Sequence, residues 1–216
     1  MTDPGLRERK KARTRQVIAD AAARLFAQLG YEQVAVSDVA REAEVSEQTV
    51  YNYFQTKEQL VTDRDQLIQG ELSRLIRTRA PGTTPAAAIR EFVLDTVEGI
   101  RRIPPGQWRG ELGYLAAISP TVHRLALELS DRQATALATA IAETDTVAPE
   151  IARLRGMALA GVFQIIITEA GRRTCEGQSQ NQIADELRPA IEAVLDDLDA
   201  WLRLRLAWRR CAVARP

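Results

Sequence analysis

Four polar side chains within one short segment have the chemistry needed to read DNA bases. They are Glu47, Gln48, Tyr51 and Asn52. In a helix, these positions turn away from the apolar residues at 50 and 54. Amide side chains pair with adenine edges, a carboxylate accepts from the cytosine amino group, and a tyrosine packs on the thymine methyl group. Polar groups on the outer face of a short helix are what base reading requires.

Two short helices joined by a tight turn would place these side chains. Ser46 is a favourable N-cap, so we expect the base-reading helix to begin there. The residues before it recur at helical spacing: Val36, Val39, Ala40 and Ala43. Val45 supplies an apolar turn residue between the two segments. This arrangement predicts a helix-turn-helix, whose second helix can enter the major groove.

Further helices are expected on both sides of this motif. Residues 6–29 show an apolar stripe at helical spacing, and Gly30 stands where a helix C-terminus favours glycine. The stripe comprises Val17, Ile18, Ala21, Ala22, Leu25, Phe26 and Leu29. Thr56 and Gln59 form a capping-box pattern, which predicts one continuous helix from Lys57 towards Arg79. Residues 7–15 hold six basic residues against one acid, which favours contact with phosphates.

The order of these features closely resembles the DNA-binding domain of the TetR family of bacterial transcriptional regulators. The shared features, over about residues 10–61, are the basic arm, Leu29-Gly30-Tyr31, Val36 to Ala40, Val45-Ser46, Thr49 to Phe54 and Thr56 to Leu60. The resemblance implies an all-α protein with a three-helix DNA-binding domain and a C-terminal helical domain for ligand binding and dimerisation. We expect residues 1–56 to form the arm and helix-turn-helix domain, 57–79 a connecting helix, and 80–216 the C-terminal domain.

The resemblance also implies roles for individual residues. Base contacts fall on Glu47, Gln48, Tyr51 and Asn52, in agreement with their chemistry. Phosphate contacts are expected at Arg13, Ser37, Ser46, Thr49, Tyr53 and Lys57. The alternative is that the two tyrosines only pack and that Glu47 is a solvated acid.

Three positions depart from the family pattern in and just before the helix-turn-helix. The usual hydroxyl cap before Val36 is missing, because residues 34 and 35 are Val34 and Ala35. Asp38 can still bond back to the backbone as half of a capping box, and the change should cost about 1 kcal/mol. The turn position, commonly glycine, is Glu44, which must adopt a left-handed conformation or reshape the turn at a similar cost of about 1 kcal/mol.

The middle of the chain is expected to form helices around a ligand pocket. After a linker-like break at residues 80–85, the pattern predicts helices over 86–102, 108–118 and 120–143, the last with Ser119 as its N-cap. Candidate lining residues are Phe92, Trp108, Tyr114, Leu115, His123 and Phe163, with Arg109, Glu111 and Gln164 as polar contacts. The alternative is that the aromatic residues belong to the core and that His123 lies on the surface.

Two long helices, over 150–172 and about 181–205, are expected to finish the fold, with Ser179 and Gln182 capping the second. We predict a homodimer through a four-helix interface that includes Leu154, Gly161, Ile165, Leu187, Ile191, Val194 and Leu198. The alternative is that both helices only close the core of one chain. The arginine-rich tail after Trp201 is expected to be a frayed, solvated terminus, although it could touch a partner subunit, nucleic acid or an anionic surface.

Composition narrows the function. Of the 216 residues, 45% are hydrophobic, which is enough to bury a core, so we expect a folded, soluble protein. The net charge of +0 argues neither for nor against binding to nucleic acid. Two cysteines and one histidine are too few for a disulfide framework or a metal site, so we expect no metal and no cofactor in a cytoplasmic protein. The longest apolar stretch, Met157 to Thr168, is shorter than the ~20 residues of a membrane span.

The residues point to a regulator rather than an enzyme. Clustered acids, a glycine-rich phosphate loop and a paired nucleophile and base are all missing from the sequence. We expect a dimeric repressor that binds a pseudo-palindromic DNA operator and is released by a small-molecule ligand. The alternatives are a transcriptional activator of the same fold, and a helical small-molecule carrier whose DNA-binding head is vestigial.

Overall fold

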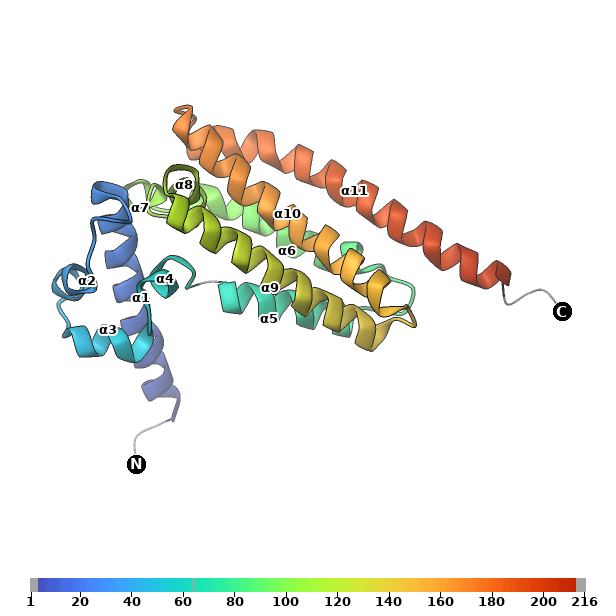
Figure 1. Cartoon of the computed structure of the whole chain (residues 1–216), viewed down its shortest axis with the longest axis horizontal. Coiled ribbons are helices and arrows are strands. Elements are labelled where there is room, and N and C mark those ends of the chain that lie inside the picture. The colour runs from blue at the N-terminus through green and yellow to red at the C-terminus, as the bar shows by residue number, and fades with distance from the viewer. Residues whose placement is uncertain (1–3, 64, 213–216) are drawn as a thin grey trace.

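The computed structural model describes residues 4–63 and 65–212, with side chains described for residues 5–63 and 68–203. These residues form eleven α-helices and one short 3-10 helix, which confirms the all-α prediction. A small N-terminal head sits at one end of an elongated helical body (Figure 1). The arginine-rich tail beyond Arg203, for which alternative contacts were considered, lies outside the described side chains.

The head is built from α1 (Pro4–Leu29), α2 (Val36–Glu42), α3 (Glu47–Tyr53) and α4 (Lys57–Val61). The inner face of α1 buries most of the expected stripe, including Ile18, Ala22 and Phe26, whereas Val17 and Leu29 at its margins are exposed. Gly30 ends the helix in a left-handed conformation, with φ of 82°. The predicted C-terminal glycine is therefore confirmed.

The prediction of one continuous helix from Lys57 to Arg79 is wrong. The chain leaves the helix at Thr62, where φ is −107° and ψ is 20°, and α5 (Asp65–Thr78) begins anew. The capping box is also displaced by one residue, because Gln59 Oε1 accepts from the backbone N–H of Gln55 at 2.8 Å. Side-chain contacts of Asp63 with α1, described below, favour the break over a straight helix.

The body contains α6 (Pro85–Gly99), the 3-10 helix η1 (Ile100–Arg102), α7 (Pro105–Trp108), α8 (Leu112–Ile118), α9 (Pro120–Thr144), α10 (Pro149–Cys175) and α11 (Gln180–Ala212). Sequence periodicity predicted a single helix over 108–118, but the structure has two, separated near Gly110. A Cβ atom on Gly110 would lie 1.8 Å from the backbone oxygen of Ala23. Glycine is required there because α1 approaches the backbone itself.

The head and the body share a hydrophobic core. Apolar residues of α8 and α9 pack into the core of the head: Leu115, Ala116, Val122 and Ala126. Ser119, the N-cap of α9, also donates to the carboxylate of Glu32 in the head. The head is therefore fixed to the body by α7, α8 and the start of α9, and not only by the chain connection through α5.

Two arginines and one aspartate form a nearly buried charged group at the far end of the body. Asp145, in the loop between α9 and α10, accepts from Arg79 through Oδ1 and from Arg155 through Oδ2, the latter at 3.1 Å. Arg79 follows α5 and Arg155 lies in α10. One carboxylate thus ties three segments together, which sequence patterns did not reveal because 66 positions separate Arg79 from Asp145.

Candidate nucleic-acid interface and ligand cavity

The helix α3 presents its polar residues to solvent. Its inner face is held by Val50 and Phe54, which are buried in the core of the head. Ser46 caps the helix by accepting from the Thr49 N–H at 3.1 Å. The four residues predicted to contact bases, Glu47, Gln48, Tyr51 and Asn52, lie together on the exposed face, with Tyr51 45% exposed. Their placement suits base reading; the contacts themselves stay a prediction.

One hydrogen bond orders the exposed amides of α3. Gln48 Nε2 donates to Asn52 Oδ1 at 3.2 Å, so the two side chains are held one helical turn apart on the same face. This leaves the Asn52 amide hydrogens directed away from Gln48. A donor presented in this way suits the acceptor atoms that purines show in the major groove.

The residues predicted to contact phosphate differ in exposure. Arg13, Ser37 and Ser46 are exposed, whereas Thr49, Tyr53 and Lys57 are half-buried. The Nζ atom of Lys57 lies 4.2 Å from the centroid of the Tyr31 ring. Burial lowers the pKa of Lys57 against the opposing effect of Glu32 and Glu58. Burial, together with the charge of Glu58, raises the pKa of Tyr31 to about 12.

The two departures from the family pattern are resolved locally. Asp38 Oδ2 accepts from the Ala35 N–H at 2.9 Å, which replaces the missing side-chain cap of α2. Glu44 adopts the left-handed conformation, with φ of 54°, so the turn keeps its shape despite the absence of glycine. Both predictions about these positions are confirmed.

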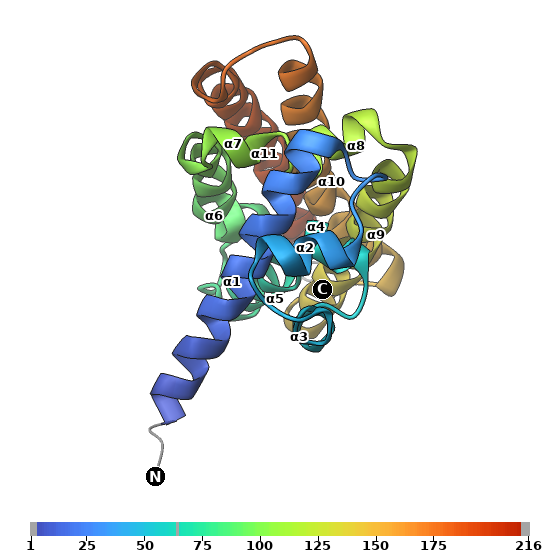
Figure 2. The ribbon, with the colours of Figure 1, turned by 90° about the vertical axis from the view of Figure 1, so that its left-hand side faces the viewer.

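The N-terminal half of α1 extends beyond the head on the side of α3 (Figures 1 and 2). Its basic side chains are exposed: Arg7, Arg9, Lys10, Lys11 and Arg13. The basic run is thus a helical arm rather than an irregular one. An exposed helix with a large excess of positive charge next to the polar face of α3 creates a local field that attracts a phosphate backbone, although the whole chain is neutral.

Arg15 joins three parts of the head, a role that sequence patterns did not indicate. Its Nε donates to Asp63 Oδ1 at 2.6 Å, and its Nη1 donates to the Tyr53 carbonyl at 2.9 Å. The guanidinium carbon also lies 4.5 Å from the centroid of the Phe54 ring. Arg15 therefore holds the C-terminal end of α3 and the end of α4 against α1.

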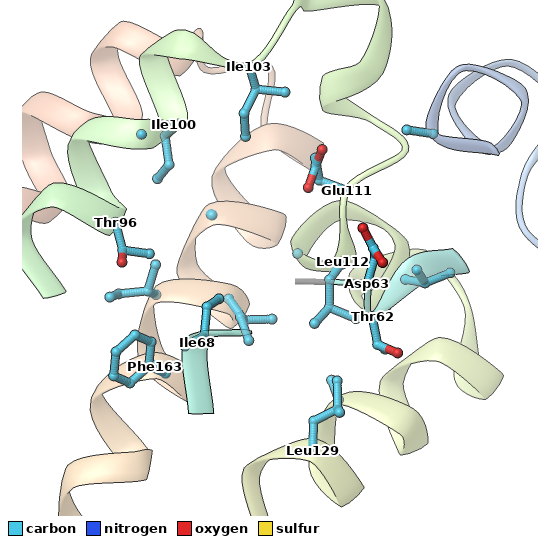
Figure 3. Close-up of a pocket in the computed structure, with 18 of the residues that line it drawn as sticks. Thr62, Asp63, Ile68, Thr96, Ile100, Ile103, Glu111, Leu112, Leu129 and Phe163 are labelled. Carbon is cyan, nitrogen blue, oxygen red and sulfur yellow. The ribbon is translucent and has the colours of Figure 1, made fainter. Parts of the chain in front are cut away.

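A cavity of about 420 Å³ lies where the head meets the body. Helices α6, α9 and α10, η1 and the α7–α8 segment form most of its wall, and α1, α4 and α5 complete it. Apolar side chains such as Ile68, Leu112, Leu129 and Phe163 project into this space, with Asp63 and Glu111 among the polar ones (Figure 3). Its volume falls in the usual range for small-molecule sites, roughly 300–1,000 Å³.

The structure separates the residues predicted to line a pocket into two groups. Phe92, Trp108, Glu111, Phe163 and Gln164 line the cavity.

The other group lies outside this cavity. Leu115 is buried in the core of the head, and Tyr114 packs against that core with Arg109 5.7 Å from its ring centroid. His123 is exposed on α9. Periodicity put these residues in the right helices but could not indicate which face of each helix meets the head.

The walls contributed by α1 and α4 were also missed. Residues such as Ala19 and Ala23 of α1 and Leu60 of α4 line the cavity. In the sequence they belong to the helices of the head, so only the packing of the head against the body shows that they line the cavity. A molecule bound in the cavity would touch the head directly.

The predicted dimer surface is exposed on α10 but not on α11. Leu154, Met157 and Ile165 of α10 are 50%, 54% and 40% exposed, and a Cβ on Gly161 between them would meet no atom within 4 Å. These positions follow one another at spacings of three and four, so they form one stripe. Met157 was not among the predicted residues.

The α11 part of the interface prediction needs correction. Leu187 and Ile191 are 1% and 0% exposed, and both pack in the core of the body. Val194 and Leu198 are half-buried against the same core. The stripe on α11 therefore closes the core of its own chain, because α11 packs on α6 and α10 with that face. Only the α10 stripe remains free among the described residues named in the prediction.

Helix α10 is the one helix among the described residues whose length and composition would let it cross a membrane. Its opposite face is buried against α8 and α9. These features mark a core helix with one apolar stripe left uncovered.

Comparisons with known proteins agree with this geometry. Residues 18–63 match the family described as bacterial regulatory proteins, tetR family. The transcriptional regulator TcmR of Streptomyces glaucescens is 27% identical over 151 residues, which cover 70% of this chain and 62% of that protein. DhaS, an operon transcriptional activator of Lactococcus lactis, is 39% identical over 57 residues, 26% of this chain and 30% of its own length. The matches thus span less than two thirds of both relatives.

Solved structures share the fold over most of the chain. The structure of NalD, a secondary repressor of a multidrug efflux pump in Pseudomonas aeruginosa, has a TM-score of 0.53 and 17% identity, covering 85% of this chain and 97% of its own. At this identity the likeness concerns the fold alone, and it extends through both the head and the body.

Proposed function

Because the chain belongs to the TetR family of bacterial transcriptional regulators, we propose that it is a ligand-responsive repressor that binds a pseudo-palindromic operator as a homodimer. Proteins of this family are DNA-binding regulators and not enzymes. The observation that carries the proposal is the exposed face of α3, where four base-reading side chains lie beside a basic helical arm.

In this proposal, α3 enters the major groove with Glu47, Gln48, Tyr51 and Asn52 at the base edges. Arg13, Ser37, Ser46, Thr49, Tyr53 and Lys57 contact the phosphates and set the orientation of the helix. Lys57 reaches its phosphate by leaving the Tyr31 ring, a contact made at a half-exposed site. Phosphate contacts supply affinity that depends on salt, whereas the base contacts supply sequence preference.

Dimerisation follows from the limited reach of one α3 helix. A symmetric pair of heads can read two half-sites about 34 to 36 Å apart, or a multiple of that distance. The uncovered stripe of Leu154, Met157, Gly161 and Ile165 supplies an apolar, self-complementary surface for this pairing. Gly161 allows the backbones of two α10 helices to approach closely.

The ligand releases the protein from the operator by binding in the cavity between head and body. A molecule there contacts α1, α4 and α6 at once, so its binding favours one arrangement of the head over another. A coupling of about 1 to 3 kcal/mol between ligand and operator is enough for a useful switch.

Activation is the second candidate, because the relative DhaS is described as an activator. Repression and activation use the same DNA-reading surface. A reporter gene behind the operator separates them: deletion of the regulator raises expression if it represses and lowers expression if it activates.

Operator binding is the decisive test. The DNA flanking the gene and a random oligonucleotide pool should be titrated at low salt without ligand, with fluorescence anisotropy as the readout. We expect selection of a sequence with two-fold symmetry and a stoichiometry of an even number of chains per site. Absence of binding to both DNA sources would contradict the regulator proposal and favour the alternative of a carrier with a vestigial head.

A further inference from the structure

The cavity wall has an unequal charge distribution. It contains the carboxylates of Asp20, Asp63, Asp95 and Glu111, but Arg102 is its only basic side chain among the described residues. Arg102 pairs with Asp95 at 2.9 Å, and both of these side chains are largely exposed at the rim. Arg15, from outside the wall, pairs with Asp63, so four carboxylates face two guanidinium groups, and this balance favours a cation over an anion.

Asp63 and Glu111 are the carboxylates labelled in the view of the cavity, on the side opposite Phe163 and Thr96 (Figure 3). Asp63 follows α4 and Glu111 precedes α8, so the two come from the head and from the body. A positively charged group between them would be held by both parts of the protein.

The remainder of the wall favours an apolar molecule of drug size. Phe92 and Phe163 form an aromatic pair with ring centroids 6.4 Å apart, and Ile68, Ile103, Leu112 and Leu129 add aliphatic surface. Such a wall attracts the body of a lipophilic ligand, while the carboxylates select its charge.

Two lining side chains have polar atoms without partners. Trp108 is only 9% exposed, and its Nε1–H has no acceptor. The buried Oε1 of Gln164 has no donor. Both atoms are covered by protein, so neither is presented to a molecule in the cavity.

Asp63 links the cavity to α3 through Arg15. Arg15 binds its Oδ1 through both Nε and Nη2 at 2.6 Å and at the same time holds the Tyr53 carbonyl at the end of α3. The Arg15 and Asp63 side chains are 40% and 16% exposed, so the Arg15 side of this ion pair is open to solvent and Arg15 can move away when another cation reaches Asp63. Loss of the Asp63 contact would release one of the points that fix Arg15 and, through it, α3.

From these observations we propose that the cavity binds a lipophilic monocation, whose charge lies between Asp63 and Glu111 and competes with Arg15 for Asp63. This inference rests on the proposed regulatory function and specifies its ligand and its route to the DNA. Cation binding weakens the hold of α1 on the C-terminal end of α3, and operator affinity falls.

The charge preference can be tested with two ions of the same shape and opposite charge, tetraphenylphosphonium and tetraphenylborate. Isothermal titration of the full chain should show the cation binding at least about tenfold more tightly than the anion. Equal or tighter binding of tetraphenylborate, or no binding of either ion, would overturn the proposal.

Matched variants locate the binding site. Glu111→Gln should weaken tetraphenylphosphonium binding by about fivefold or more, whereas Glu143→Gln, which alters an exposed ion pair with Arg77 away from the cavity, should leave it unchanged. Thermal unfolding of both variants checks that they fold. Equal cation affinity of the folded Glu111→Gln variant and the parent would contradict the assignment.

Coupling to DNA is measured by anisotropy on the selected operator. Tetraphenylphosphonium should lower the operator affinity of the parent chain by about tenfold. Asp63→Asn should bind the operator more weakly without any ion and show little further response. If the parent binds its operator but the cation has no effect, the competition with Arg15 is wrong while the regulatory function stands. If the operator itself is not bound, the proposed function fails first.

Discussion

Asn52 and Lys57 test the division between base contacts and phosphate contacts. Asn52 lies on the exposed face of α3 and is oriented by Gln48. We expect Asn52→Ala to reduce discrimination at one base pair of each half-site by about 1 to 3 kcal/mol. Lys57→Ala should weaken binding to all sequences alike and reduce the salt slope by about 1. Titrations of operator and mismatched DNA at several salt concentrations measure both effects.

A Gln33→Ala variant, which changes an exposed residue of the loop before α2, provides the control for these titrations. Similar losses on operator and random DNA for Asn52→Ala would show that Asn52 only supports affinity. A change of sequence preference in Lys57→Ala would show that the roles are not separated as proposed.

Glu44 holds an unfavourable backbone conformation, with φ of 54°. We expect Glu44→Gly to raise the free energy of unfolding by up to about 1 kcal/mol, because glycine adopts this conformation without a steric penalty. Urea unfolding provides the measurement. Glu44→Gln removes the charge but keeps the Cβ, so it should leave stability nearly unchanged; an equal gain in both variants would assign the effect to charge.

At the scale of elements, Asp145 joins α5, the loop after α9, and α10. Replacing it with alanine leaves the nearly buried Arg79 and Arg155 without this carboxylate. We expect Asp145→Ala to lower the free energy of unfolding by about 3 to 5 kcal/mol. Glu143→Ala removes an exposed pair with Arg77 and should cost less than about 1 kcal/mol.

Denaturant unfolding of both variants, followed by circular dichroism, measures this difference. Equal losses in the two variants would mean that the Asp145 network contributes no more than a surface ion pair does. In that case the loop after α9 would be held by apolar packing alone.

The whole molecule is proposed to act as a pair through the α10 stripe. Ile165→Glu puts a charge on this apolar surface, and in a symmetric interface the two copies bring two such charges together. We expect the variant to be monomeric by light scattering at micromolar concentration and to lose most of its operator affinity. Leu127→Glu, at an exposed residue of α9, is the matched control.

A dimeric Ile165→Glu variant would place the interface elsewhere on the body. A monomeric variant that still binds the operator with the parent affinity would contradict the need for a pair of heads.

Local chemistry alone determined much of the head. The outward face of α3, the Ser46 cap, the left-handed turn at Glu44 and the end of α1 at Gly30 depend on periodicity, side-chain hydrogen bonds and backbone preference within a few residues. These were predictable because the interacting groups are neighbours in the chain. The all-α class followed from the same patterns repeated over the body.

Tertiary structure decided which face of each later helix is used. Tyr114 and His123 have the residue types of a ligand pocket, but the docking of the head turned them away from the cavity. Leu187 and Ile191 form a good interface stripe, yet α11 uses it within its own chain. An apolar stripe shows that a helix must be covered but does not show by what. The role of Arg15 could not be predicted either, because its partners lie 38 and 48 positions away in the sequence and contact it only after the helices have packed.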